Sequence, residues 1–261
     1  MIKRTFKTIK QNPIIVAILF IPFVYSTINT IFFADVRVAY NPMILMEQTS
    51  NPMVWVSILF NFLYMVGYSI FLYPAISRYI YLAASEMPRE KWYQKCFKGF
   101  WWRGFVINIF VGIVTMVFLM PIAVGAALVY FNTYSVFWVI LLGVVAALLL
   151  FVVTSFNFIA ISAVFAEDDF SAGFSNMFKA WKKSFRKIIP LALIGFLPFI
   201  AIYVSMFGYG VEQLDNVMSI GLSFYMILVG IFTAVYSMHC YVDYKNKQIA
   251  ETQAEGSCEN R

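Results

Sequence analysis

Residues 135–166 read SVFWVILLGVVAALLLFVVTSFNFIAISAVFA, and this run decides the fold of the chain. It contains no Asp, Glu, Lys or Arg, and it is longer than the ~20 apolar residues that a helix needs to cross the hydrocarbon core of a bilayer. A soluble protein of this size would need a charged exterior, yet only 12% of the 261 residues are charged and 62% are hydrophobic. The sequence therefore predicts an all-α membrane protein.

Five further uncharged runs reach spanning length, and together with 135–166 they predict a polytopic protein with six transmembrane helices. We expect one membrane domain over 1–247 and a polar, disordered cytoplasmic tail over 248–261. The first run follows basic residues as a signal peptide would, but it is too long and lacks a small-x-small cleavage site, so we expect a retained anchor. The predicted spans are about 13–33, 53–77, 104–129, 135–166, 188–211 and 217–242.

The basic residues fall on one side of this topology. The N-terminus, the second and fourth connecting segments and the tail hold 18 of the 19 Lys and Arg, and Arg37 alone lies on the other side. Because basic residues are enriched in cytoplasmic loops, we expect a multi-pass protein of the cell membrane with both termini in the cytoplasm. The net charge of +6 then faces an anionic inner leaflet and calls for no nucleic-acid partner.

The segments predicted on the inner side are amphipathic. Apolar and basic residues separate onto opposite helix faces over 88–103, over 167–187 and, in a shorter version, over 2–10. Such helices either lie in the inner interface, in contact with lipid or a partner, or serve as connectors held at the membrane surface. The residues predicted to contact the inner leaflet are Lys91, Trp92, Lys95, Lys98, Trp101, Lys179, Trp181, Lys182, Lys183 and Arg186.

Few polar residues lie inside the predicted spans. Asn61, Asn108 and Asn157 are expected to form interhelical hydrogen bonds, and the alternative is that they line a cavity. His239, near the inner end of the last span, is expected to be an interfacial hydrogen-bonding residue. No ionisable residue lies at the middle of a span, which argues against an ion pathway through this chain.

The sequence offers little to a catalytic or cofactor site. One histidine excludes most histidine-based metal and nucleophile arrangements, and no P-loop glycine pattern occurs. Glu167, Asp168 and Asp169 are adjacent and so do not share a helix face, and they are expected to mark the start of a helix. The three cysteines, Cys96, Cys240 and Cys258, lack paired spacing and are expected to be reduced. We therefore expect a protein that is not an enzyme and has no cofactor or metal.

Three motifs carry a resemblance to a known family. They are Lys10-Gln11-Asn12-Pro13 before the first span, the amphipathic segment from Phe178 to Pro190, and the closing Tyr241-Val242-Asp243-Tyr244-Lys245-Asn246-Lys247. In this order they resemble a broad group of bacterial polytopic proteins, related to the membrane domain attached to some glycerophosphodiester phosphodiesterases. The resemblance implies a membrane-embedded helical partner or organiser of other membrane components. It does not imply phosphodiesterase activity, because the chain has no room for the soluble catalytic domain.

The expected function is that of a non-enzymatic membrane module which engages lipid or partner proteins at the inner face. An alternative is the permease subunit of an ABC exporter, which can also have six spans, no intramembrane charge and a separate ATPase. The Glu and Gly-Thr pattern that often follows the second span in that family is missing here. The expected partners are membrane lipids of the anionic inner leaflet, with other membrane proteins or an ATPase subunit as the alternatives.

Overall fold

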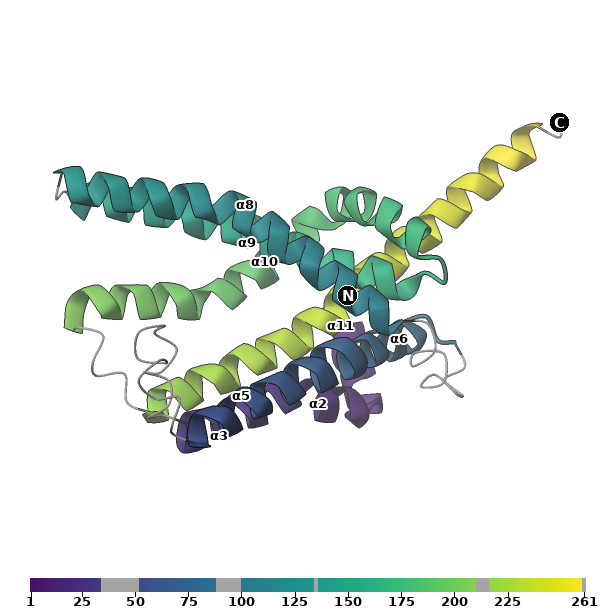
Figure 1. Ribbon diagram of the computed structural model, residues 1–261. Helices are drawn as coiled ribbons and strands as arrows, with labels where there is room; N and C mark the ends of the chain where they lie inside the picture. The colour runs from purple at the N-terminus through teal and green to yellow at the C-terminus, as the bar shows by residue number, and fades with distance from the viewer. Residues whose placement is uncertain (34–51, 88–99, 134–135, 210–215, 260–261) are drawn as a thin grey trace.

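The computed structural model describes residues 1–33, 52–87, 100–133, 136–209 and 216–259, and the regular secondary structure in these ranges is helical (Figure 1). This confirms the predicted all-α class. The elements are α1 (Ile2–Gln11), α2 (Pro13–Leu19), α3 (Ile21–Phe32), α5 (Pro52–Tyr64), the π-helix η2 (Met65–Leu72), α6 (Tyr73–Ala84), α8 (Trp101–Thr133), α9 (Val136–Ala166), α10 (Phe170–Tyr209) and α11 (Asn216–Glu259).

Four helical stretches among the described residues are long and apolar enough to cross a membrane, which makes the chain a membrane protein by length and composition. They overlap the first, second, fourth and sixth predicted spans. The third predicted span lies within α8, and most of the fifth lies within α10. The four stretches are Pro13–Phe32, Pro52–Ala84, Val144–Ala166 and Ser223–Ala254.

Two of the predicted spans are less regular than the sequence suggested. The first divides at Phe20 into α2 and α3, and Pro22 stands in the first turn of α3. The second contains the π-helical turns of η2, which are followed by Pro74 in the first turn of α6. A proline lacks the backbone N–H that continues an α-helix, and Pro22 and Pro74 each stand in the first turn of a new helical segment.

The first two spans run antiparallel to each other. The Tyr79 hydroxyl of α6 donates to Asn12 Oδ1 before α2 at 3.0 Å, and Tyr25 of α3 donates to Asn61 of α5. The later residue in one span thus meets the earlier residue in the other, as in a helical hairpin. Helices α8 and α9 form a second hairpin in Figure 1.

Helices α9 and α11 run in the same general direction where they cross, which fixes the direction of α10. Ser162 of α9 meets Ser237 of α11 at 3.0 Å between hydroxyl oxygens, and Glu167 after α9 meets Tyr241 of α11 at 2.7 Å. The chain must therefore turn back between the end of α9 and the start of α11. Helix α10 provides that return, so the long helices alternate in direction along the chain.

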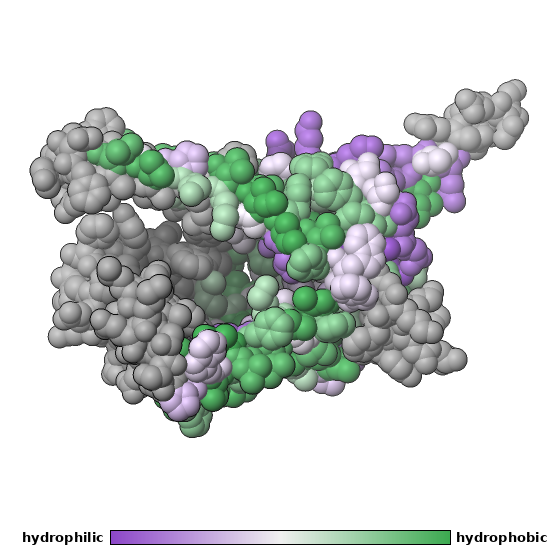
Figure 2. All heavy atoms as spheres, in the orientation of Figure 1, coloured by the Kyte–Doolittle hydropathy of each residue, from purple (hydrophilic) through white to green (hydrophobic). Residues whose placement is uncertain are grey.

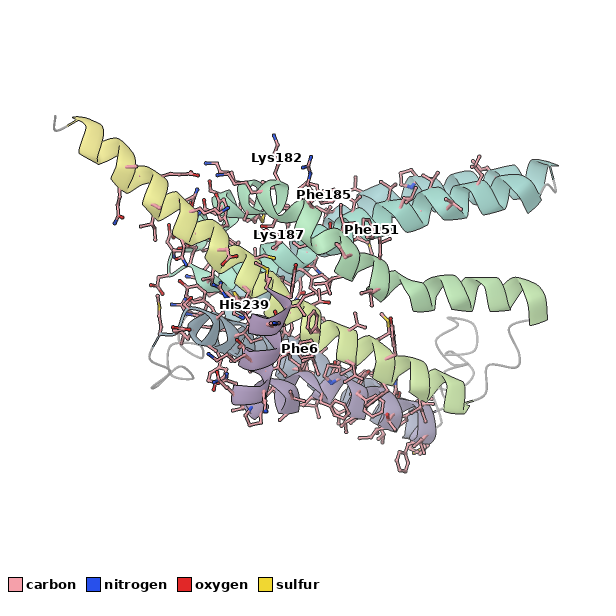
Figure 3. The ribbon with its side chains drawn as sticks, turned by 180° about the vertical axis from the view of Figure 1, so that it is seen from behind. Phe6, Phe151, Lys182, Phe185, Lys187 and His239 are labelled. Atoms are coloured by element: carbon pink, nitrogen blue, oxygen red, sulfur yellow. The ribbon has the colours of Figure 1, made fainter. Side chains whose placement is uncertain are left out.

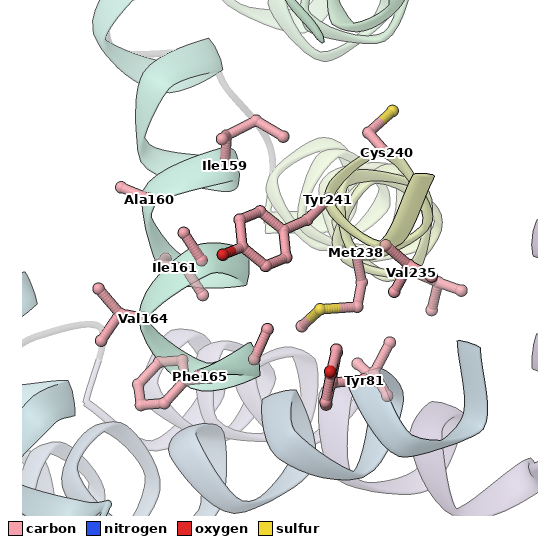
Figure 4. Packing of buried hydrophobic residues seen from close by; sticks show 14 of the residues in the cluster. Tyr81, Ile159, Ala160, Ile161, Val164, Phe165, Val235, Met238, Cys240 and Tyr241 are labelled. Carbon is pink, nitrogen blue, oxygen red and sulfur yellow. The ribbon is translucent and has the colours of Figure 1, made fainter. Parts of the chain in front are cut away.

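The helices separate into two arms that join at one end (Figure 1). One arm contains α3, α5 and the first half of α11, and the other contains α8 and α9. The core of fully buried side chains lies at the junction, where Tyr241 reaches from α11 toward α9 and Met238 lies between α11 and Tyr81 of α6 (Figure 4). Tyr241, Ile159 and Phe165 are each 0% exposed. The junction therefore holds the larger of the two clusters of buried hydrophobic side chains in the described part of the chain.

The tail that the sequence predicts to be disordered is helical over residues 248–259, where α11 continues to Glu259. The segment is polar, but it continues an established helix and is rich in Ala, Gln and Glu, which favour helix. Lys183 of α10 lies 3.7 Å from Glu251, between Nζ and Oε2, which adds a contact along the exposed extension.

Candidate functional site

Two buried arginines hold the carboxyl end of α9. Arg78 of α6 is 6% exposed, and its Nη1 donates to Phe165 O at 3.2 Å and to Ala166 O. Its Nη2 donates to Asp168 Oδ1 at 2.7 Å. The last carbonyls of a helix lack partners within the helix and carry its negative dipole end, so a cation with several N–H groups fits there.

Arg103, in the first turn of α8, approaches the same helix end. It is 7% exposed and donates through Nη1 to Val164 O at 3.2 Å and to Glu167 O at 2.7 Å, and through Nη2 to Asp168 O. The Phe100 ring lies beside both guanidinium groups, 5.3 Å from Arg78 Cζ and 4.1 Å from Arg103 Cζ. Arg78 directly follows the second predicted span, and Arg103 directly precedes the third. A basic residue at the very edge of a span is the sequence signal that could have marked both.

The three adjacent acids divide between three tasks. Glu167 accepts from the Tyr241 hydroxyl at 2.7 Å and from Lys245 Nζ at 2.8 Å, while Asp168 pairs with Arg78. Asp169 accepts from the backbone N–H groups of the first turn of α10, at 3.2 and 3.3 Å, and so caps that helix. The expected helix start is present at Asp169. In the described part of the chain, no group of three His, Cys, Asp or Glu residues is placed to hold a metal ion.

The beginning of α10 docks on α9 by one face. A Cβ atom at Gly173 would lie 3.0 Å from both the Ala163 oxygen and the Val164 Cα, so the two backbones approach very closely there. Trp181 donates from Nε1 to Ser155 Oγ at 3.1 Å and is half-buried. Trp181 therefore contacts protein through one side. The buried residues on this face are Gly173, Met177, Ala180, Ser184 and Ile188.

The opposite face of the same helical turns is basic and exposed. Lys183 is paired with Glu251, and Lys187 Nζ lies 3.9 Å from Asp243 Oδ2. Within the described ranges, Lys179, Lys182 and Arg186 have no ion-pair partner. We call Lys179, Lys182 and Arg186 the basic face of α10. Three uncompensated cations on one helix face form a local excess of positive charge.

Helix α1 crosses α11. His239 Nε2 and Thr8 Oγ1 share a buried hydrogen bond of 3.0 Å, and the sulfur atoms of Met1 and Cys240 lie 3.3 Å apart. Both ends of α1 thus contact neighbouring residues of α11, which is possible only if the two helix axes cross. Phe6, His239 and Lys187 gather where α1, α10 and α11 meet (Figure 3).

The burial pattern of α1 is the reverse of that of a helix in a soluble protein. Thr5 and Thr8 are 0% and 7% exposed against the protein, whereas Ile2 and Phe6 are 59% and 60% exposed. A helix at the surface of a soluble protein would turn its large apolar residues inward. The outward apolar residues of α1 therefore suit surroundings that are themselves apolar.

The three predicted asparagines lie on three different helices. Asn61 of α5 accepts from Tyr25 of α3 and donates from Nδ2 to Ser57 O at 2.7 Å, so it takes part in an interhelical contact. Asn108 is exposed on α8. Asn157 Oδ1 is buried on α9 without a hydrogen-bond partner among the described residues.

Four of the residues predicted at the inner leaflet, Lys91, Trp92, Lys95 and Lys98, fall outside the described residues, as does Cys96. Trp101 is the first residue of α8 and is 45% exposed.

Comparisons with protein-family models, with curated proteins and with solved structures find no match to this chain. The resemblance noted in the sequence therefore stays a prediction.

Proposed function

We propose that this chain is a membrane protein with six spans and cytoplasmic termini, and that its cytoplasmic face binds the anionic headgroups of the inner leaflet. The observation that carries the proposal is the basic face of α10. Its three cations stay exposed and without an acidic partner in the described chain, while the other side of the same turns is docked on α9.

The helix directions support six spans. If α9 and α11 both cross the membrane and run parallel, α10 must cross between them in the opposite direction. By the same reasoning, α8 must cross in order to reach the start of α9. Helix α8 has 33 residues and α10 has 40, which exceeds the ~20 needed for one passage.

The distribution of polarity supports a membrane-facing basic end. Hydrophilic residues gather around the beginning of α10 and the second half of α11. Hydrophobic residues cover α8 and the arm that contains α3 and α5 (Figure 2). A basic residue near an anionic surface contributes about 1 kcal/mol of attraction, which salt weakens. Three cations on one face are thus enough to enrich anionic lipid beside this helix.

The test compares lipid preference in reconstituted full-length protein. The variant Lys179→Gln/Lys182→Gln/Arg186→Gln removes the charges of the basic face, and Lys179→Arg/Lys182→Arg/Arg186→Lys keeps them as the matched control. Spin-labelled phosphatidylglycerol and phosphatidylcholine report the selectivity of the lipid shell by electron paramagnetic resonance. We expect the native chain and the control to prefer phosphatidylglycerol in a salt-dependent manner, and the glutamine variant to lose much of that preference.

Equal selectivity in all three proteins, at low and at moderate salt, would remove lipid binding as the function. Purification in mild detergent tests the other expectation from the sequence. A stoichiometric ATPase that copurifies with the chain would overturn the proposal in favour of a permease subunit.

A further inference from the structure

Arg4 of α1 and Lys187 of α10 meet on one carboxylate of α11. Arg4 Nη1 lies 3.4 Å from Asp243 Oδ1, and Lys187 Nζ lies 3.9 Å from Asp243 Oδ2. Charge-assisted hydrogen bonds between nitrogen and oxygen are normally about 2.7–2.9 Å long, so neither cation is tightly bound. Among the described residues, two cations on this one acid leave one positive charge uncompensated, and most of their N–H donors have no acceptor there.

The seam where these three residues meet is open to a ligand. The side chains of Arg4 and Lys187 are 70% and 46% exposed, and that of Asp243 is 30% exposed. The two cations come from helices far apart in the sequence, and the Thr8–His239 hydrogen bond holds α1 against α11 beside them. An acceptor with several oxygens could bind both cations at once, as a phosphate does.

The other side of α1 is aromatic. The Phe6 ring packs on Phe232 of α11 with 5.1 Å between centroids, and Phe232 packs on Tyr236 at 6.0 Å. Phe232 precedes Asp243 by roughly 16 Å along α11, at 1.5 Å per residue. Helix α1 therefore presents a cation toward one end of α11 and an exposed phenyl ring toward the other.

We propose, building on the proposed function, that this seam binds one anionic phospholipid, with its phosphate on Arg4 and Lys187 and its acyl chain along Phe6 and Phe232. The charge accounts for the anion, and the exposed Phe6 accounts for the hydrocarbon, since a soluble phosphate would leave this ring without a role. The polar-to-apolar order along α11 matches that of a phospholipid at the inner interface.

Native mass spectrometry of delipidated full-length protein, titrated with phosphatidylglycerol, tests this site. We expect one tightly bound lipid, and an affinity at least about tenfold lower in the double variant Arg4→Gln/Lys187→Gln. The control variant Lys10→Gln/Lys247→Gln removes the same number of charges from exposed positions outside both the seam and the basic face of α10, and should change this affinity less than about twofold. The conservative variant Arg4→Lys/Lys187→Arg should retain the lipid.

Two further variants separate the two halves of the site. Asp243→Asn removes the competing carboxylate and should tighten lipid binding, a gain that a misfolded protein cannot produce. Phe6→Ala should weaken binding of phosphatidylglycerol although both cations remain. Glycerol 3-phosphate carries the phosphate without acyl chains, and we expect it to displace the lipid only at far higher concentration.

Unchanged lipid affinity in Arg4→Gln/Lys187→Gln would overturn the site, even if neutralising the basic face of α10 still reduced the selectivity of the lipid shell. That result would leave the proposed function in place. If neutralising the basic face also left the selectivity of the lipid shell unchanged, the proposed function and the seam site would both be removed. Displacement by glycerol 3-phosphate at the same concentration as lipid would overturn the lipid assignment in favour of a soluble phosphate ligand.

Discussion

At the scale of the residue, the contacts of Arg78 and Arg103 contribute most to the fold, although the sequence shows these two residues only as positive charges in an inner loop. Arg78 and Arg103 were predicted to lie on the inner side, but not to converge on the end of α9. Their partner carbonyls lie far along the chain, 87 residues from Arg78 to Phe165, and no local pattern encodes such a contact. Of the three asparagines expected to form interhelical hydrogen bonds, Asn61 has such a partner in Tyr25. Asn108 is exposed, and Asn157 Oδ1 has no partner among the described residues.

Replacing Arg78 tests the importance of this contact for stability. Arg78→Met keeps most of the side-chain volume but leaves two backbone carbonyls and Asp168 without their donor, so we expect a loss of about 3 kcal/mol. That loss corresponds to a melting midpoint lower by roughly 5–10 °C. The buried thiol of Cys240, 1% exposed, reports unfolding through a thiol-reactive dye in a Cys96→Ser/Cys258→Ser background.

Lys182→Met is the matched control, because Lys182 is exposed and has no ion pair in the described chain, so its midpoint should change by less than about 2 °C. An equal midpoint for Arg78→Met and the parent protein would contradict the stabilising role assigned to Arg78.

At the scale of the element, α10 illustrates what a hydrophobic pattern leaves open. The stripe that includes Met177 and Trp181 predicts a helix with one apolar face, and the structure has that helix. Hydropathy cannot tell whether the apolar face meets acyl chains or another helix, because both are apolar. In the structure, Met177 is fully buried and Trp181 donates to Ser155 of α9, so packing against protein takes up this side.

The close contact between α10 and α9 makes a specific prediction at Gly173. Gly173→Ala would place a methyl group 3.0 Å from the α9 backbone, which cannot move aside as a side chain could, so α10 must shift. We expect a loss of about 1–3 kcal/mol in the free energy of unfolding.

Gly112→Ala in α8 provides the comparison, since nothing lies within 4 Å of its added methyl group. That change should be neutral or stabilising by up to about 1 kcal/mol, because alanine favours helix over glycine. Thermal unfolding of both variants in the same detergent gives the measurement. Similar midpoints for the two would show that the helices are farther apart than described.

At the scale of the whole molecule, the long uncharged runs predict the class and the positions of the helices. They do not predict that the helices diverge into two arms and meet at one end (Figure 1). That arrangement depends on contacts between distant segments, such as Tyr241 with Glu167 and His239 with Thr8. The polar seam at the junction joins α1 and α11 to α10, and for this reason the proposed lipid contacts concentrate there.

The central claim, six spans with the basic end in the cytoplasm, is tested most directly by cysteine labelling of intact cells with a membrane-impermeant maleimide. Single cysteines at Glu47, Asn132, Lys182 and Ile249 are placed in a background that lacks the three native cysteines. We predict that Glu47→Cys and Asn132→Cys react from outside, and that Lys182→Cys and Ile249→Cys react only after permeabilisation. Asn132, at the carboxyl end of α8, is decisive for the third span. Protection of Asn132→Cys, or reaction of Lys182→Cys in intact cells, would contradict the account.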